Sequence, residues 1–410
     1  MTDVSGAAPV PRRGVGPQAV LLAGSTGVAQ LITALLFVLA ARSTSPEDFG
    51  TIAAAVALGT SFVGLIDFGT NGYWVRELAR QAMSRQEYGR RLASKLLIAA
   101  TVAVVLGVSV HLILPSSNYW MAAPVGFALF VNQSAQVPLR GMARTELVSF
   151  SVLLDRLLAL GVLAIAIAVG VAAHEILWLC LTIGSLAAAC VGWLMTPSQF
   201  RPIMSFRLKT NPWQKSGFYG LNSAALAAQT LDLPLLALAG GAGAAGLYGA
   251  VNRWTQPLGL LISAFSSASA PFVARSVSWE EAWSHVRKAL WLPALTILGC
   301  IAVAAAAPWV VALLLGDAYD GSSALLRILA LAMIPVVINS PLSSFLQSMG
   351  HDKGVSLIVL ISVGAQLASV LVLGWLYGAV GAAVGFAVLQ VVILISMSIL
   401  ALRASRARRT

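Results

Sequence analysis

Long apolar runs separated by short polar breaks dominate the pattern of this chain. A helix that crosses the hydrocarbon core of a bilayer needs about 20 apolar residues, and the sequence offers about twelve such runs. We predict membrane spans at residues 18–41, 50–72, 92–114, 119–139, 147–172, 175–195, 217–239, 246–273, 289–315, 324–348, 354–376 and 380–402. The predicted fold class is therefore all-α, a polytopic membrane protein with two six-helix lobes.

The spans and breaks divide the chain into five segments. Residues 1–17 and the basic residues 403–410 are predicted to be cytoplasmic tails. We expect residues 18–195 to form an N-terminal lobe, 196–216 a cytoplasmic linker and 217–402 a C-terminal lobe. The first apolar run has about 24 residues, whereas the core of a secretory signal has about 7–15. We therefore expect this run to remain as a span.

Matched polar residues in the two halves predict an internal repeat. At an offset of 199 residues Gln30 falls on Gln229, and at an offset of 207 Asn132 falls on Asn339. Chance identity is the alternative, although Gln and Asn are rare in these apolar runs. Two six-span repeats of the same orientation are expected to relate by an axis along the membrane normal, and transporters of this kind bind substrate between their repeats.

Composition supports the same fold class. Hydrophobic residues make up 58% of the 410 residues and charged residues only 10%, and the mean hydropathy is +0.85. Soluble domains carry roughly 25% charged residues. Cys180, Cys190 and Cys300 all lie inside predicted spans without metal-ligand spacing, so we interpret them as packing residues and predict neither a metal site nor an organic cofactor.

Basic residues determine the predicted orientation. All but four of the 26 Lys and Arg residues fall in segments that are cytoplasmic when the N-terminus is placed in the cytoplasm, as the positive-inside rule requires. We therefore predict a multi-pass protein of the cytoplasmic membrane with both termini cytoplasmic. We expect the basic residues that give the net charge of +11 to interact with anionic membrane lipids. No nucleic acid is expected as a partner.

Several short segments resemble a known family. They are Ala41-Arg42, Pro46 and Phe49-Gly50 after the first span, Asp67-Phe68-Gly69 at the end of the second, and residues 325–350. In these segments the chain resembles the Wzx-type polysaccharide flippases of the multidrug/oligosaccharidyl-lipid/polysaccharide exporter superfamily. The resemblance implies export of a lipid-linked glycan by alternating access. Lipid II flippases of the same superfamily commonly have fourteen spans and are less similar in that respect.

The polar breaks give no support to an enzyme. No predicted external loop exceeds roughly ten residues, whereas membrane glycosyltransferases, polymerases and ligases need larger catalytic loops. The glycine-rich turn at 240–246 lacks the Lys-Ser/Thr pair of a phosphate-binding loop, so ATP hydrolysis is not predicted.

Arginines inside the spans are the main candidates for substrate binding. A charge inside a bilayer normally faces a cavity or a partner, and guanidinium groups bind phosphate oxygens in bidentate fashion. We predict that Arg156, Arg253, Arg327 and Arg42 line a central cationic cavity that binds a diphosphate. The alternatives are that Arg253 pairs with Asp232, and that the two arginines nearest the membrane surface extend to the interface.

Three acids are candidates for proton or sodium coupling. They are Asp155, Asp232 and Asp67. Because Asp155 and Arg156 are adjacent on one helix, we expect their side chains to point about 100° apart. No cofactor other than a coupling ion is expected.

The sequence thus predicts a flippase that exports a polyprenyl-diphosphate-linked oligosaccharide or polysaccharide unit across the cytoplasmic membrane. Glycan-assembly proteins and membrane lipids are the expected partners. Two alternatives remain open. A multidrug exporter of the same superfamily would need an acidic cavity for cationic drugs, and a non-transporting scaffold for cell-envelope assembly would need no cavity chemistry at all.

Overall fold

The structure is a computed structural model. It describes residues 15–115, 117–203, 210–214, 216–253, 287, 290–348 and 351–407. Within these ranges the chain is helical, with short 3-10 turns and no strand. Nine helices in the described ranges are long and apolar enough to cross a membrane, and the longest of them contains two of the predicted spans. The predicted fold class is confirmed.

Helices of the first half overlap the first six predicted spans one by one. They are α1 (Val15–Arg42), α2 (Pro46–Asp67), α4 (Arg85–Ile113), α5 (Ala122–Gly141), α6 (Thr145–Ala168) and α7 (Ala173–Met195), with the shorter α3 (Thr70–Ala79) between α2 and α4. The start of α2 follows from its sequence. Ser45 Oγ accepts the backbone N–H of Asp48 at 3.2 Å, and Pro46 occupies the first helical turn, a combination that favours helix initiation.

Helices of the second half depart from the predicted spans at two places. They are α8 (Gly217–Gln229), α9 (Asp232–Gly240), α10 (Ala242–Asn252), α13 (Trp291–Leu314), α14 (Ser322–Ser348) and α15 (Asp352–Ala407). The seventh predicted span is interrupted at residues 230–231, between α8 and α9. The last two spans form the two arms of α15, which is kinked at Gly378 with φ +60°, a conformation that glycine adopts without steric cost. Most of the eighth predicted span lies outside the described residues.

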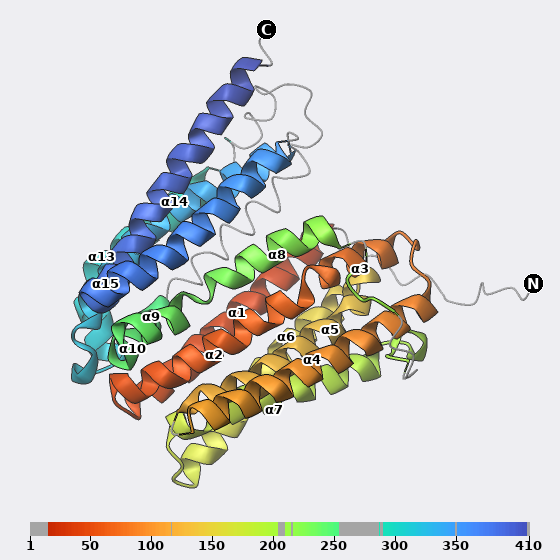
Figure 1. Cartoon of the computed structure of the whole chain (residues 1–410), viewed down its shortest axis with the longest axis horizontal. Helices are drawn as coiled ribbons and strands as arrows, with labels where there is room; N and C mark the ends of the chain where they lie inside the picture. The colour runs from red at the N-terminus through yellow and green to blue at the C-terminus, as the bar shows by residue number, and fades with distance from the viewer. Residues whose placement is uncertain are drawn as a thin grey trace, which may run out of the picture.

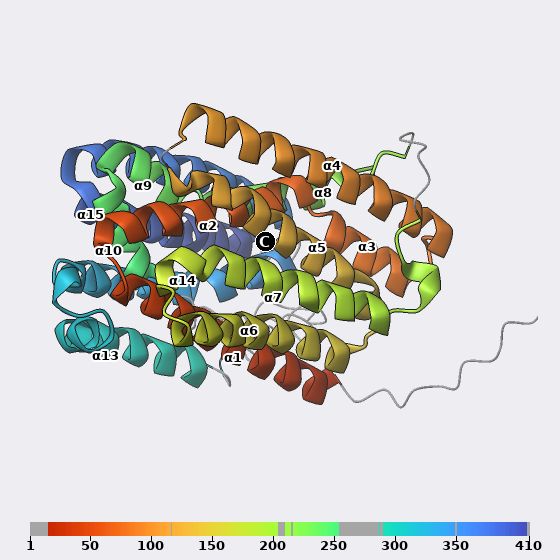
Figure 2. The same cartoon turned by 90° about the horizontal axis from the view of Figure 1, so that it is seen from below.

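The helices form two groups that approach each other at one end. Figure 1 shows α1–α7 on one side and α13–α15 on the other, with α8–α10 between them. The groups converge where α1 passes into α2 and diverge toward the N-terminus of α1 and the C-terminus of α15. From below, α4 lies at one margin of the molecule and α1 and α13 at the opposite margin (Figure 2). By the predicted orientation, the convergent end faces outward.

Glycines permit direct backbone contact at the convergent end. A Cβ atom built on Gly50 of α2 would lie 1.9 Å from the carbonyl oxygen of Ala242, and one on Gly246 of α10 would lie 1.7 Å from the carbonyl oxygen of Pro46. Real Cβ atoms do not approach other atoms so closely. The helices α2 and α10 can therefore pack in this way only with glycine at both positions.

Aromatic residues continue this contact between the two groups. The Phe49 ring packs edge-on against Phe37, with centroids 6.2 Å apart, and against Tyr319, with centroids 6.3 Å apart. Burial and the nearby Asp48 raise the pKa of the Tyr319 hydroxyl, so the group stays protonated. It donates a hydrogen bond to the carbonyl oxygen of Ala41 at 3.1 Å. We call Phe37, Phe49 and Tyr319 the aromatic seal.

We predict that single cysteines at Ser117 and Asp320 react with a membrane-impermeant thiol reagent in intact cells, whereas one at Gln86 does not. The background should carry Cys190→Ser, because Cys190 is the exposed native cysteine in the described ranges. Ser322, two residues after Asp320 at the start of α14, is a poor probe because it is fully buried. Labelling at position 86 from outside, with positions 117 and 320 unreactive, would reverse the orientation.

Candidate functional site

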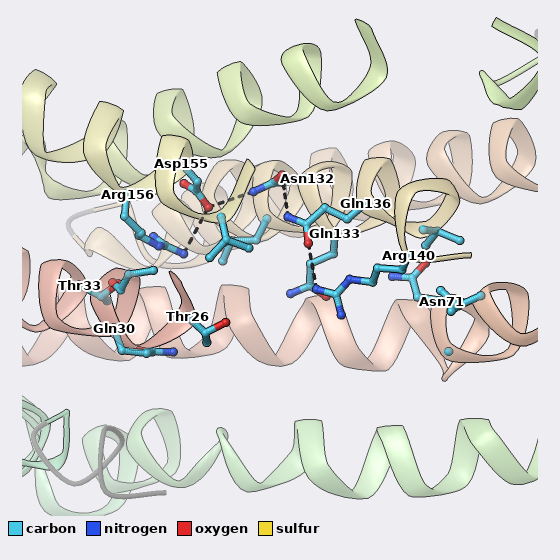
Figure 3. Close-up of a pocket in the computed structure, with 16 residues that line it drawn as sticks. Thr26, Gln30, Thr33, Asn71, Asn132, Gln133, Gln136, Arg140, Asp155 and Arg156 are labelled. Carbon is cyan, nitrogen blue, oxygen red and sulfur yellow. Dashed lines mark hydrogen bonds and ion pairs between the residues drawn. The ribbon is translucent and has the colours of Figure 1, made fainter. Parts of the chain in front are cut away.

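A cavity of about 500 Å³ lies between α1, α5, α6 and the start of α3. Figure 3 shows side chains from α1 on one wall and from α5 and α6 on the other. The polar residues of its lining are Thr26, Gln30, Thr33, Asn71, Asn132, Gln133, Gln136, Arg140, Asp155 and Arg156. Neutral amides and hydroxyls are the majority, so the charges of this cavity come from two arginines and one acid.

Asp155 and Arg156 both face this cavity. The Arg156 side chain folds back, and its Nη2 lies 3.5 Å from Asp155 Oδ2, so the expected separation of their charged ends is wrong. The Cβ directions do diverge on a helix, but the long arginine side chain compensates for it. Asp155 also accepts hydrogen bonds from Asn132 Nδ2 at 3.0 Å and from Ser185 Oγ at 3.1 Å. The carboxylate is therefore fully engaged by polar partners.

A chain of hydrogen bonds runs along one face of α5 from Asp155 to Arg140. Arg140 Nη2 donates to Gln136 Oε1 at 2.9 Å, and Gln136 Nε2 donates to Asn132 Oδ1 at 3.4 Å. We call Asn132 and Gln136 the amide ladder (Figure 3). Arg140 follows the predicted span 119–139 and is one of the basic residues that were predicted to lie on the cytoplasmic side. The four-residue spacing of 132, 136 and 140, which places side chains on one helix face, was the signal that could have identified this row.

Arg253 lies at the end of α10 and contacts the other half of the molecule. Its guanidinium carbon is 4.4 Å from the centroid of the Phe37 ring, a cation–π geometry. Arg253 does not itself line the cavity. Of the two arginines that were predicted deepest in the spans, Arg156 therefore lines this cavity and Arg253 packs on Phe37 from the other half of the molecule.

The alternative pairing of Arg253 with Asp232 is not formed. In the described part of the chain no ion pair within 4.0 Å joins these two residues. Asp232 instead accepts the backbone N–H of Leu233 at 2.7 Å and the hydroxyl of Tyr248 at 3.3 Å. Its hydrogen-bond partners are therefore uncharged.

Arg42 and Arg327 do not line this cavity. Arg42 is exposed in the last turn of α1. Arg327 is exposed on α14, and its Nε donates to the carbonyl oxygen of Ala304 in α13 at 3.3 Å. Both arise near helix ends, where a long basic side chain reaches the polar interface without entering the interior.

Asp67 is paired with a lysine that the sequence analysis counted as cytoplasmic. Lys95 Nζ lies 2.5 Å from Asp67 Oδ1 and 2.8 Å from Asn71 Oδ1, and the lysine is fully buried. Its ammonium group also lies 4.6 Å from the centroid of the Trp74 ring. Asp67 further accepts the Thr70 hydroxyl at 3.0 Å. This pair connects α4 with the turn between α2 and α3.

Comparison with known proteins agrees with this architecture. A family model described as "Polysaccharide biosynthesis protein" matches residues 16–277, and a search of curated proteins found no match. Among solved structures, a lipid II flippase, MurJ, in an inward closed conformation is similar with a TM-score of 0.75 and 11% identity, covering 92% of this chain and 86% of that chain.

Two solved structures of a multidrug resistance MATE family transporter of the MOP superfamily, one in an inward-facing and one in an outward-facing conformation, are also similar. The inward-facing structure has a TM-score of 0.65 and 14% identity, covering 96% of this chain and 99% of that chain. The outward-facing structure has a TM-score of 0.56 and 14% identity, covering 97% of this chain and 98% of that chain. These likenesses establish the fold, which has two lobes.

We predict that Asp67→Asn lowers the free energy of unfolding by about 3–5 kcal/mol, because it leaves the Lys95 charge buried without its counter-ion. Denaturant unfolding of the detergent-solubilised protein measures the effect. The double variant Asp67→Asn with Lys95→Met should recover most of the loss, and Glu47→Gln, at an exposed acid, should change little. Equal losses in the single and double variants would show that the ion pair does not stabilise this turn.

Proposed function

This chain belongs to the family of polysaccharide biosynthesis proteins and has the fold of MOP superfamily transporters, and on that basis we propose that it is a flippase. Its substrate is an oligosaccharide or polysaccharide unit linked to a polyprenyl diphosphate, which it exports across the cytoplasmic membrane. One observation carries the proposal: the cavity is lined by two guanidinium groups, Arg140 and Arg156, and by a single carboxylate, while Arg253 of the other half has no ion pair within 4.0 Å in the described ranges.

Like charges in a membrane interior favour an anionic ligand. Desolvation makes each uncompensated charge costly there, and two guanidinium groups within electrostatic range add mutual repulsion. Asp155 offsets part of the Arg156 charge at 3.5 Å, while Arg253 rests on an aromatic ring. A diphosphate between them would supply the missing negative charge, and guanidinium forks match its oxygens. A cationic drug would instead meet two cations.

Closure at one end fits the direction of transport. The backbone contact of Gly50 with α10 and the aromatic seal close the end that the basic residues assign to the outside. The head group would therefore enter from the cytoplasmic leaflet while the polyprenyl chain stays in the lipid. In this proposal the surrounding membrane lipids and the glycan-assembly proteins that supply the substrate are the partners.

The coupling ion is proposed to act at Asp232. Asp155 and Asp67 each lie beside a basic residue, Arg156 and Lys95, which leaves little room for a proton or a sodium ion. Asp232 accepts only uncharged donors among the described residues. Its bond from Tyr248 also ties it to α10, the helix that ends at Arg253, so neutralising it would act on the helix that carries this arginine.

We predict that Arg156→Ala abolishes surface polysaccharide in a strain that depends on this gene, while Arg156→Lys retains partial activity. The lysine keeps the charge but loses the bidentate fork, and hydrogen bonds to charged groups are worth about 1.5–3 kcal/mol, so transport should fall about tenfold or more. Arg327→Ala is the matched control, because this arginine lies outside the cavity. Surface polysaccharide is measured at equal membrane levels of each variant.

Normal export by both Arg156 variants would show that Arg156 is not needed to bind the diphosphate, and would contradict the proposed anion site. Loss of resistance to cationic drugs, with surface polysaccharide intact, would favour the exporter. Unchanged assembly with all arginine variants would favour a scaffold.

We further predict that Asp232→Asn uncouples transport from the ion gradient. In vesicles, an imposed proton or sodium gradient should accelerate transport by the wild type but not by the variant, whereas binding of polyprenyl diphosphate should persist. Asp317→Asn, at an exposed acid in the loop before α14, is the control. A variant that still responds to the gradient would exclude Asp232 as the coupling residue.

A further inference from the structure

The amide ladder is buried and yet lines the cavity. Asn132 and Gln136 are each 4% exposed, and both contribute to the cavity wall. Within the ladder each amide uses one N–H and accepts one hydrogen bond. A primary amide has two N–H donors and two lone pairs on its oxygen. Each of these side chains therefore retains one donor and one acceptor for a ligand.

Charges at its two ends orient the ladder. Asp155 is acceptor-only when ionised, and Arg140 is donor-only. The Asn132 amide nitrogen must therefore point toward Asp155, and the Gln136 oxygen toward Arg140 (Figure 3). Neither amide can rotate without losing a charged partner. The donors and acceptors that remain are presented to the cavity in one fixed pattern, which lowers the entropic cost of binding.

Neutral polar groups also occupy the opposite wall. Thr26, Gln30 and Thr33 of α1 follow a spacing that places them on one helix face, and they line the cavity across from α5. The side chains of Gln30 and Gln133 make no hydrogen bond to another residue in the described ranges. A ligand between α1 and α5 would therefore meet amides and hydroxyls from two sides.

We propose that the amide ladder, with Gln133 and Gln30, is a sugar-binding subsite that reads the hydroxyl and acetamido groups of the sugars next to the diphosphate. Uncharged groups that both donate and accept are the complement of amide side chains. The row from Asn132 to Arg140 covers about 12 Å at 1.5 Å per residue, which suits a short oligosaccharide rather than a single ring. The subsite begins beside Arg156, where the diphosphate is proposed to bind.

This inference rests on the proposed function and adds specificity to it. A site built from hydrogen-bonding groups discriminates strongly against a ligand that lacks the matching polar groups, because its own groups are then left unpaired. Arg156 and Arg253 would retain any polyprenyl diphosphate, whereas the ladder would select the glycan.

Binding of two probes to the full chain in lipid nanodiscs separates the two ideas. One probe is polyprenyl diphosphate, and the other is the lipid-linked glycan purified from a strain that lacks the gene. The wild type should bind the glycan-bearing probe about tenfold more tightly. In Gln136→Leu and Gln133→Ala this advantage should disappear, while the affinity for polyprenyl diphosphate stays unchanged. Arg156→Ala should weaken binding of both probes.

Gln366→Leu is the matched control, because Gln366 is a buried amide of α15 outside this cavity whose oxygen has no hydrogen-bond partner in the described ranges. The exposed position 133 keeps the test valid if position 136 variants fold poorly. Equal affinity of the wild type for both probes, or an unchanged glycan advantage in both glutamine variants, would overturn the subsite. A wild type that binds neither probe, or a strain that accumulates no lipid-linked glycan, would instead refute the flippase itself.

Discussion

The high free energy of a charge in a membrane interior is the constraint on which the rest of this structure depends. Each interior charge is compensated by different neighbouring groups. Asp67 is neutralised by Lys95 between aromatic rings, and Asp155 by Arg156 with two neutral donors. Arg253 has an aromatic ring and a more distant acid. The compensation is thus complete around the turn after α2 and incomplete at Arg253, where we propose that the substrate binds.

Phe37 connects the substrate region with the closed end of the molecule. The Arg253 guanidinium packs on the Phe37 ring. Phe49 of the aromatic seal packs edge-on against the same ring. Phe49 in turn contacts Tyr319, whose hydroxyl bonds to the end of α1. An anion that draws Arg253 away from the ring would therefore act on residues that hold the lobes together. The backbone contact at Gly50 and Gly246 fixes how closely they approach.

Sequence reasoning recovered what depends on helix length and on local chemistry. Span positions follow from apolar run length, and the start of α2 from Ser45 and Pro46. It did not predict the contacts that side chains make from one helix to another. Lys95 lies near the start of the predicted span 92–114 but about three turns inside α4, and only tertiary packing turns it inward toward Asp67. The break between α8 and α9 has a local signal that the predicted span 217–239 passed over, because Pro234 cannot donate a hydrogen bond to the carbonyl oxygen of Thr230. The hydroxyl contact between Ser61 and Thr230 at 2.6 Å joins distant parts of the chain and could not be predicted.

The candidate site was predicted in the same uneven way. Arg156, which was selected for its depth in a span, lines the cavity. Arg327 does not, and depth alone does not say which face of α14 a residue occupies. The central claim is that this protein carries a lipid-linked glycan to the outer leaflet. Extraction of lipids from a strain that lacks the gene tests it most directly. The account predicts an accumulated lipid-linked glycan confined to the cytoplasmic leaflet and cleared by complementation; a deletion strain without that intermediate, with surface polysaccharide intact, would contradict it.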